Sequence, residues 1–108
     1  MKIIIVGDGK IGSVLAEQLS REAHEVTLID RSDKPLEQTN KELDVMVVEG
    51  DGSSHEVLKE AGVEQADLLI ACTGADELNL LCCLIAKKLG ARHTIARVRN
   101  PQYVEELS

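Results

Sequence analysis

The stretch MKIIIVGDGKIG, residues 1–12, decides the fold of this chain. Its β-branched run at positions 2–6 predicts a short strand that is buried on both faces. The pattern G-x-G-x-x-G follows at once in residues 7–12, and residues 10–22 then have helical spacing. A glycine turn between a buried strand and a helix is typical of the first unit of an α/β domain.

The alternation of strand and helix continues along the chain. Apolar runs predict four more strands, at residues 25–29, 45–48, 67–72 and 93–98, and helical spacing recurs at residues 33–43, 53–61 and 75–89. Right-handed helical crossovers between such strands make them parallel. The sequence therefore predicts a Rossmann-like, doubly wound parallel sheet of about five strands in a three-layer αβα arrangement.

Two helix starts carry the spacing of a capping box, in which a hydroxyl and a carboxylate three residues later satisfy each other's backbone amides. Ser53 precedes Glu56, and Thr73 precedes Asp76. We expect both pairs to cap their helices.

Composition limits the class of protein. The 108 residues fit a single domain, and 44% hydrophobic with 29% charged residues is typical of a folded, water-soluble chain. No apolar run reaches the roughly 20 residues of a membrane span, and the absence of a leading signal segment argues against secretion. The three cysteines lack zinc or redox spacing, so we expect reduced core residues at Cys72, Cys82 and Cys83.

The net charge of −7 argues against nucleic acid as a partner, because nucleic-acid affinity comes mainly from cations that neutralise phosphates. The charge is unevenly distributed, however. Five of the twelve basic residues follow position 80, and they form either a solvated face or a group that partly faces an anionic ligand: Lys87, Lys88, Arg92, Arg97 and Arg99.

The glycine motif predicts a site for a diphosphate. Gly7 permits the tight turn, Gly9 lets a pyrophosphate approach the backbone, and Gly12 lets the helix pack closely on the strand. The amides at the helix start and the helix dipole then bind the phosphates. Asp8, Lys10 and Ile11 complete this loop as candidate contacts, and Lys10 either extends a cation toward terminal phosphates or is merely solvated.

Asp30 ends the second predicted strand, 18 residues after Gly12. A carboxylate near this offset accepts hydrogen bonds from the hydroxyls of an adenosine ribose. Its charge repels a 2′-phosphate, so the sequence favours NAD(H) over the phosphorylated dinucleotide, although the neighbouring Arg31 weakens that preference. The alternative for Asp30 is a helix or turn cap.

Ligands of doubly wound sheets bind beyond the carboxyl ends of the strands, so the next two strand ends predict further contacts. We expect Asp51 and Gly52 on the adenine side, and Thr73 and Gly74 on the far phosphate or nicotinamide side, unless they serve only as turns and caps. Arg97 meets a phosphate if its side chain points to the crevice, and otherwise forms a salt bridge.

No catalytic apparatus is evident in the sequence. His24, His55 and His93 fall in a turn, at a helix start and at a strand start, so we expect structural roles for all three. The helix at residues 78–89 is apolar on almost every side, which predicts a homo-oligomer interface. The alternative is deep packing under a segment beyond Ser108.

Several motifs together resemble one known family: GDGKIG at residues 7–12, ID at 29–30, VVEGDGSS at 47–54, LLIACTGADELNLL at 68–81 and IARVRNP at 95–101. The chain resembles the nucleotide-binding lobe of TrkA-type potassium-uptake regulators, the N-terminal half of the RCK (KTN) domain. The resemblance covers essentially residues 1–108. It implies ligand contacts at Gly7 to Ile11, Asp30, Asp51, Thr73, Gly74 and Arg97.

The resemblance also implies a function. It suggests a non-catalytic cytoplasmic regulator at the inner face of the cell membrane, docked on a potassium transporter or channel subunit and responsive to NAD(H) or to ATP/ADP. It further implies dimers or ring-like oligomers. Many relatives that bind ATP have arginine at the position of Lys10, and lysine lacks the bidentate fork that grips a terminal phosphate.

The sixth strand and the ligand-sensing lobe that usually follow in this family are missing after Ser108, so we expect a fragment or a stand-alone module. A competing hypothesis is the cofactor-binding domain of an NAD-dependent oxidoreductase, which needs a substrate lobe and a proton-transfer residue that the sequence does not reveal. A third is an assembly module with a vestigial site.

Overall fold

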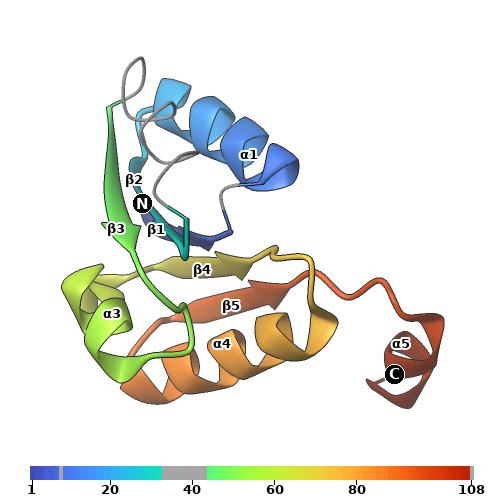
Figure 1. Cartoon of the computed structure of the whole chain (residues 1–108). Coiled ribbons are helices and arrows are strands. Elements are labelled where there is room, and N and C mark those ends of the chain that lie inside the picture. The colour runs from blue at the N-terminus through green and yellow to red at the C-terminus, as the bar shows by residue number, and fades with distance from the viewer. Residues whose placement is uncertain (8, 33–43, 108) are drawn as a thin grey trace.

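Five parallel strands form one twisted sheet in the order β3-β2-β1-β4-β5 (Figure 1). The computed structural model describes residues 1–7, 9–32 and 44–107. The strands are β1 Lys2–Val6, β2 Glu25–Asp30, β3 Val45–Glu49, β4 Leu68–Ala71 and β5 His93–Ala96. The chain starts at the centre of the sheet, builds outward to β3 and then returns to the other side of β1. This order confirms the predicted doubly wound α/β fold.

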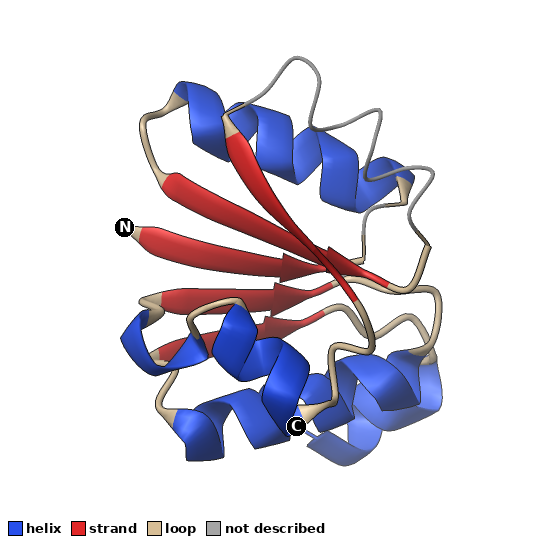
Figure 2. Ribbon diagram, turned by 60° about the vertical axis from the view of Figure 1, so that its left-hand side comes forward, coloured by secondary structure: helices blue, strands red, loops and turns tan. Residues whose placement is uncertain are grey.

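Helices cover both faces of the sheet (Figure 2). The first helix packs on one face, against β1 and β2, and the helices that follow β3 and β4 pack on the other. The helices are α1 Lys10–Arg21, α3 His55–Glu60, a 3₁₀ turn at Val63–Gln65, α4 Asp76–Leu89 and α5 Pro101–Leu107. The helix predicted at 33–43 and the loop residue Asp8 lie outside the described residues.

The central strand explains why the two layers hold together. Alternate residues of β1 point to opposite faces, and Ile3, Ile4 and Ile5 are all fully buried. Ile3 and Ile5 belong to the apolar cluster under α1, whereas Ile4 belongs to the cluster under α3 and α4. The prediction of a strand buried on both faces is thereby confirmed.

The three cysteines are buried and free, as the sequence predicted. Cys82 and Cys83 pack in the cluster between the sheet and α4, and Cys72 packs in the cluster on the α1 side. They act as small apolar residues in a core that contains no phenylalanine or tryptophan.

Both predicted capping boxes are wrong. The N-cap of α3 is Ser54, whose side chain accepts from the Val57 amide, and Ser53 bonds to Asp51 instead. No side chain caps α4, and the Asp76 carboxylate accepts from backbone amides of the segment that precedes α5. Spacing along one helix does not reveal a partner from a distant segment.

The C-terminal part also differs from the prediction. Strand β5 ends at Ala96 rather than at residue 98, and the chain then runs past the start of α4 into α5, which the sequence analysis did not anticipate (Figure 1). The hydroxyl of Tyr103 in α5 donates to Glu77 of α4 at 2.7 Å. Polar contacts therefore tie α5 to the first turn of α4.

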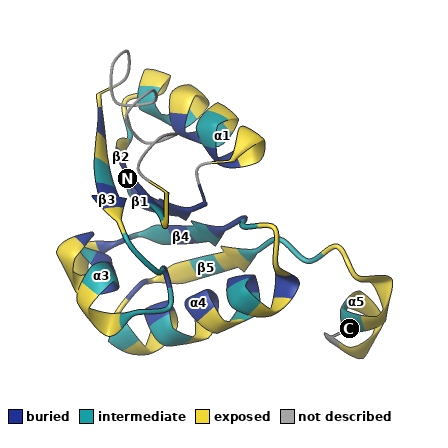
Figure 3. Cartoon of the chain, viewed as in Figure 1, coloured by how far each residue is buried: buried dark blue, intermediate teal, exposed yellow. Residues whose placement is uncertain are grey.

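Helix α4 is covered on one side only. Cys82, Cys83 and Ala86 are buried against the sheet, but Leu81 and Leu84 are 45% and 60% exposed (Figure 3). The chain itself thus leaves part of this apolar helix facing outward. Among the residues that the structure describes, no helix has the length and apolar character needed to cross a membrane.

Candidate functional site

A cavity of about 510 Å³ lies at the carboxyl ends of the strands, where the strand order reverses between β1 and β4. This is the place where doubly wound sheets bind their ligands. Nine of the twelve predicted site residues line it: Gly7, Gly9, Lys10, Ile11, Asp30, Gly52, Thr73, Gly74 and Arg97. Of the others, Gly12 is buried and Asp51 is partly exposed beside the lining residue Arg31, so neither lines the cavity, and Asp8 is outside the described residues.

Two glycines make the turn between β1 and α1 possible. Gly7 has φ +103°, which side chains disfavour, and its amide donates to the Ile29 carbonyl at 2.7 Å. A Cβ at Gly12 would lie 1.7 Å from the Gly7 carbonyl oxygen. Gly12 therefore supports the loop from behind, by allowing α1 to approach it, and does not face the cavity.

Gly9 and Gly74 have a different reason to be glycine. A Cβ at either position would meet no protein atom within 4 Å, and both residues line the cavity. Their missing side chains relieve no clash inside the protein. They instead leave backbone at the cavity wall open to a ligand.

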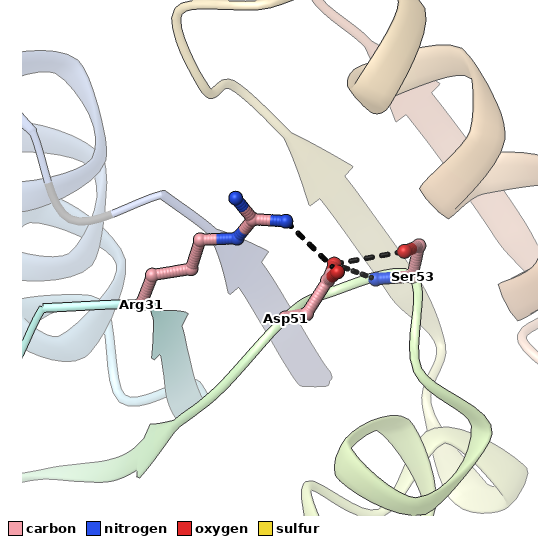
Figure 4. Close-up of polar contacts among 3 residues, drawn as sticks. All are labelled: Arg31, Asp51 and Ser53. Carbon is pink, nitrogen blue, oxygen red and sulfur yellow. Dashed lines mark hydrogen bonds and ion pairs between the residues drawn. The ribbon is translucent and has the colours of Figure 1, made fainter.

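One end of the cavity carries a group of charges from the ends of β2 and β3 (Figure 4). Asp30, the last residue of β2, lines the cavity, and its carboxylate accepts from the Ser32 amide at 3.3 Å. Arg31 also lines the cavity, and its guanidinium donates to the Asp51 carboxylate at 2.9 Å.

Asp51 is held firmly in this arrangement. Its carboxylate accepts from the Ser53 amide at 2.9 Å and from the Ser53 hydroxyl at 2.8 Å. These bonds, followed by the bond from Arg31, lower the pKa of the carboxyl below its ordinary value. The hydrogen bonds of the Asp51 carboxylate thus go to Arg31 and to Ser53 in its own turn, and Asp51 does not line the cavity.

The opposite end of the cavity is formed by the residues after β4 and β5. Thr73 follows β4, and its amide and hydroxyl both donate to the Asn79 side chain, at 2.8 and 2.7 Å. Arg97 follows β5, and no other described residue forms a hydrogen bond or ion pair with its guanidinium. Lys10, at the glycine loop, likewise has no such partner within the described parts of the chain. Neither cation is thus ion-paired within the described residues, although Arg97 lies close enough to the Asp76 carboxylate to interact with it electrostatically.

Reactive side chains contribute little to this cavity. Burial raises the pKa of the Cys72 thiol at its wall, so this thiol stays protonated at neutral pH. Burial also raises the pKa of Cys82 to about 12. None of the three histidines lines the cavity, and His24 contacts the N-terminal amine at 3.0 Å.

Several lining residues were not given a site role by the sequence analysis. The clearest cases are Gly50, Cys72, Leu78 and Arg31, which the sequence linked only to the 2′-phosphate preference. Arg31 is adjacent to Asp30 and Gly50 to the predicted Asp51–Gly52 turn, so position along the chain was an available signal for both. Leu78 belongs to an apolar helix, where nothing in the sequence separates a cavity residue from a core residue.

A doubly wound sheet with a glycine turn and a cavity at its switch point defines the Rossmann-like class of α/β domains. Comparison with known proteins gives the particular family. The sequence profile of the TrkA-N domain matches residues 3–108. The chain belongs to the TrkA-N family.

Curated relatives agree with this assignment. The chain is 45% identical over 105 residues to the Trk system potassium uptake protein TrkA homolog of Archaeoglobus fulgidus, covering 97% of this chain and 24% of the relative. It is 42% identical over 107 residues to the Trk system potassium uptake protein TrkA of Haemophilus influenzae, covering 98% of this chain and 23% of the relative. The chain thus spans about a quarter of the length of these relatives.

Solved structures share the fold. The NAD(P)-binding domain of an exopolyphosphatase-related protein from Archaeoglobus fulgidus aligns with a TM-score of 0.84 at 22% identity, over 97% of this chain and 78% of the other. The Shewanella denitrificans Kef CTD in AMP-bound form aligns with a TM-score of 0.75 at 25% identity, over 88% of this chain and 57% of the other.

Proposed function

We propose that this chain is the nucleotide-binding regulatory lobe of a potassium-uptake system, and that its ligand is NAD(H), with ATP and ADP as the competing nucleotides. Family membership and the names of the relatives support the first part of the proposal. The AMP in the Kef structure, a protein 25% identical to this chain, supports an adenine nucleotide.

In the proposed binding mode, the adenosine half lies at the end of the cavity formed by β2 and β3. Asp30 accepts from the ribose hydroxyls, and Gly52 and the turn at Asp51 border the adenine, with Arg31 beside them. The amides of the glycine loop, from Gly7 to Ile11, bind the diphosphate. Because Gly12 is buried against the Gly7 carbonyl and the Asp51 carboxylate bonds to Ser53 and Arg31, we assign them supporting roles.

The second half of the dinucleotide extends toward the residues after β4 and β5. Thr73 and Gly74 border it, and the guanidinium of Arg97 lies at the same end of the cavity. Neither Lys10 nor Arg97 forms an ion pair within the described residues, so both can offer positive charge to a ligand that carries phosphate.

The observation that carries the proposal is the pair Gly9 and Gly74. Both lie at the cavity wall, and neither needs to be glycine for packing inside the protein. If the cavity were only a gap between packed elements, nothing would require glycine at these two positions of its wall. A ligand that must approach the backbone closely explains both positions.

Regulation follows from a difference in affinity. A nucleotide that binds one arrangement of the assembled lobes more tightly shifts the population toward that arrangement, and thereby acts on a membrane transporter or channel subunit. We place the lobe in the cytoplasm, peripheral to the inner face of the membrane. We assign the exposed residues of α4, Leu81 and Leu84, to contact with a second copy of the chain.

The lobe is proposed to regulate rather than to catalyse. A dehydrogenase needs a proton-transfer group near the nicotinamide, yet the three histidines lie away from the cavity and burial keeps the Cys72 thiol protonated. Turnover of NAD+ with a panel of alcohols or hydroxy acids would favour the oxidoreductase alternative.

Calorimetric titration with NAD+, NADH, ATP and ADP tests the ligand. We expect NAD+ or NADH to bind most tightly, and Asp30→Ala to weaken that binding at least about tenfold by removing a charged hydrogen-bond acceptor. Glu49→Ala is the matched control. Glu49 pairs with Asp30 in register at the end of β3 but does not line the cavity, so its loss should leave the affinity unchanged. Equal affinities for wild type and Asp30→Ala would refute the proposed mode.

A further inference from the structure

One polar side chain in the α4 layer is completely buried. Asn79 has 0% exposure, and it lies outside the cavity lining. A buried amide without partners would be destabilising, so its hydrogen bonds explain why it is tolerated. Asn79 is also the last residue of the T-x-x-D-E-x-N stretch that begins at Thr73, and the proposed ligand contacts use only the first two residues of that stretch, Thr73 and Gly74.

Asn79 uses all of its hydrogen-bonding capacity. Its Oδ1 accepts from the Thr73 amide at 2.8 Å and from the Thr73 hydroxyl at 2.7 Å. Its Nδ2 donates to the Thr73 carbonyl at 3.1 Å and to the Arg97 carbonyl at 2.9 Å. The partners fix the orientation of the amide, because a backbone N–H can only donate and a carbonyl can only accept.

The two residues that Asn79 joins come from different strands. The β4–β5 ladder ends at the pair Ala71 and Ala96, with one more bond from the Arg97 amide to the Ala71 carbonyl. Beyond that point the chain turns away from the sheet on both sides. Beyond the last ladder bond, the side-chain amide of Asn79 links the two chain segments, because it bonds to both Thr73 and Arg97.

Thr73 and Arg97 both line the far end of the cavity. We propose that Asn79 is a positioning residue for this end of the nucleotide site: it touches no ligand itself, but it fixes Thr73 and Arg97 relative to each other. The inference rests on the proposed function, in which these two residues border the second half of the dinucleotide.

The opposite end of the cavity is built without Asn79. Asp30 and Arg31 follow β2, and the contacts of Arg31 run to Asp51 at the end of β3. None of the bonds of Asn79 reaches these residues. Loss of the Asn79 amide should therefore disturb the far half of the site and leave the adenosine half in place. A purely structural role would weaken both halves together.

Calorimetry with two probes separates these cases. AMP should occupy the adenosine half and the first phosphate position, whereas NAD+ should use both halves. We expect both Asn79→Asp and Asn79→Leu to weaken NAD+ binding at least about tenfold. The first keeps the accepting Oδ1 and loses the two N–H donors, and the second loses all four bonds. AMP binding should stay within about twofold of wild type.

Val63→Ala is the matched control for stability. Val63 is fully buried in the apolar cluster under α3 and α4, but it precedes β4 and so lies toward the amino ends of the strands, away from the cavity. This variant should bind both probes as wild type does. Equal weakening of AMP and NAD+ by the Asn79 variants, or unchanged NAD+ binding, would overturn the inference.

Hydrogen exchange on the wild-type chain gives a second test that needs no variant. The Thr73 amide, although outside the strand, should exchange about as slowly as the amides of β4, because it donates to a fully buried acceptor. Exchange as fast as at a surface loop would overturn the inference. If wild type binds neither probe, the proposed function fails and this inference with it; if it binds both and the variants weaken both equally, only the inference fails.

Discussion

Alanine at Gly9 and at Gly12 should separate ligand binding from stability. Both glycines belong to the same turn, but their surroundings differ. A Cβ at Gly9 would meet no protein atom within 4 Å, whereas a Cβ at Gly12 would lie 1.7 Å from the Gly7 carbonyl oxygen and 2.8 Å from its carbon. The first methyl group would project into the cavity, and the second into the backbone.

The expected changes in stability follow from these distances. Gly12→Ala forces the turn apart, and overpacking of this severity should lower the free energy of unfolding by about 3 kcal/mol or more. In a domain of this size the melting temperature should fall by more than about 10 °C. Gly9 has φ −57°, which alanine adopts readily. In Gly9→Ala, the weaker N-cap should lower the free energy of unfolding slightly, and the reduced freedom of the unfolded chain should raise it. The two effects should cancel to within about 1 kcal/mol.

For ligand binding we expect the larger effect at Gly9, the position where alanine should hardly change stability. In the proposed mode the diphosphate approaches the backbone at Gly9, so a methyl group there should cost about 1–3 kcal/mol of binding free energy, or about fivefold to 150-fold in the NAD+ dissociation constant. Thermal unfolding and calorimetry on the two variants measure both effects. Wild-type NAD+ affinity in Gly9→Ala, or wild-type stability in Gly12→Ala, would refute the reasoning.

Three further predictions concern stability, assembly and the C-terminal helix. Hydrogen bonds from Ser53 hold the pKa of Asp51 below its ordinary value, so its stabilising effect is complete above about pH 4 and is lost as the pH falls through the lowered folded-state pKa. The advantage of wild type over Asp51→Asn in thermal melts should therefore shrink below pH 4, and a constant difference would contradict this. Leu84→Glu on α4 should shift sedimentation equilibrium toward monomer, whereas Val14→Glu, at a 61% exposed position of α1, should not. Asp76→Ala removes the acceptor of two backbone amides ahead of α5, and hydrogen exchange in α5 should become faster.

The start of the fold was predictable because the signals there are local. The strand at 2–6 has the predicted bounds, and β2 extends the prediction by one residue. Burial on both faces favours a continuous apolar run. The turn needs glycine at Gly7 because of its positive φ and at Gly12 because of the Gly7 carbonyl five residues earlier. Where cause and effect are this close along the chain, a pattern is enough.

The predictions that failed depend on partners far along the chain. Asp76 matches a capping box with Thr73, yet its carboxylate bonds to the amides of Arg99 and Asn100, and Thr73 bonds to Asn79. Spacing along the sequence does not show that Arg99 and Asn100 reach Asp76, or that Thr73 bonds to Asn79 instead. Helix α5 is a different case, because Asn100 accepts from the Gln102 amide just ahead of the helix and proline follows it, a start signal that could have been read.

The proposed preference for NAD(H) at the adenosine end depends on how Asp30, Arg31 and Asp51 interact, and not on Asp30 alone. An aspartate such as Asp30 is expected to reject a 2′-phosphate, and an adjacent arginine is expected to weaken that rejection. Here Arg31 donates to Asp51, which two bonds from Ser53 hold in place. A 2′-phosphate would have to compete with a fixed carboxylate for this guanidinium. In the proposed mode, the preference for NAD(H) therefore depends on Asp51 as well as on Asp30, although Asp51 does not itself line the cavity.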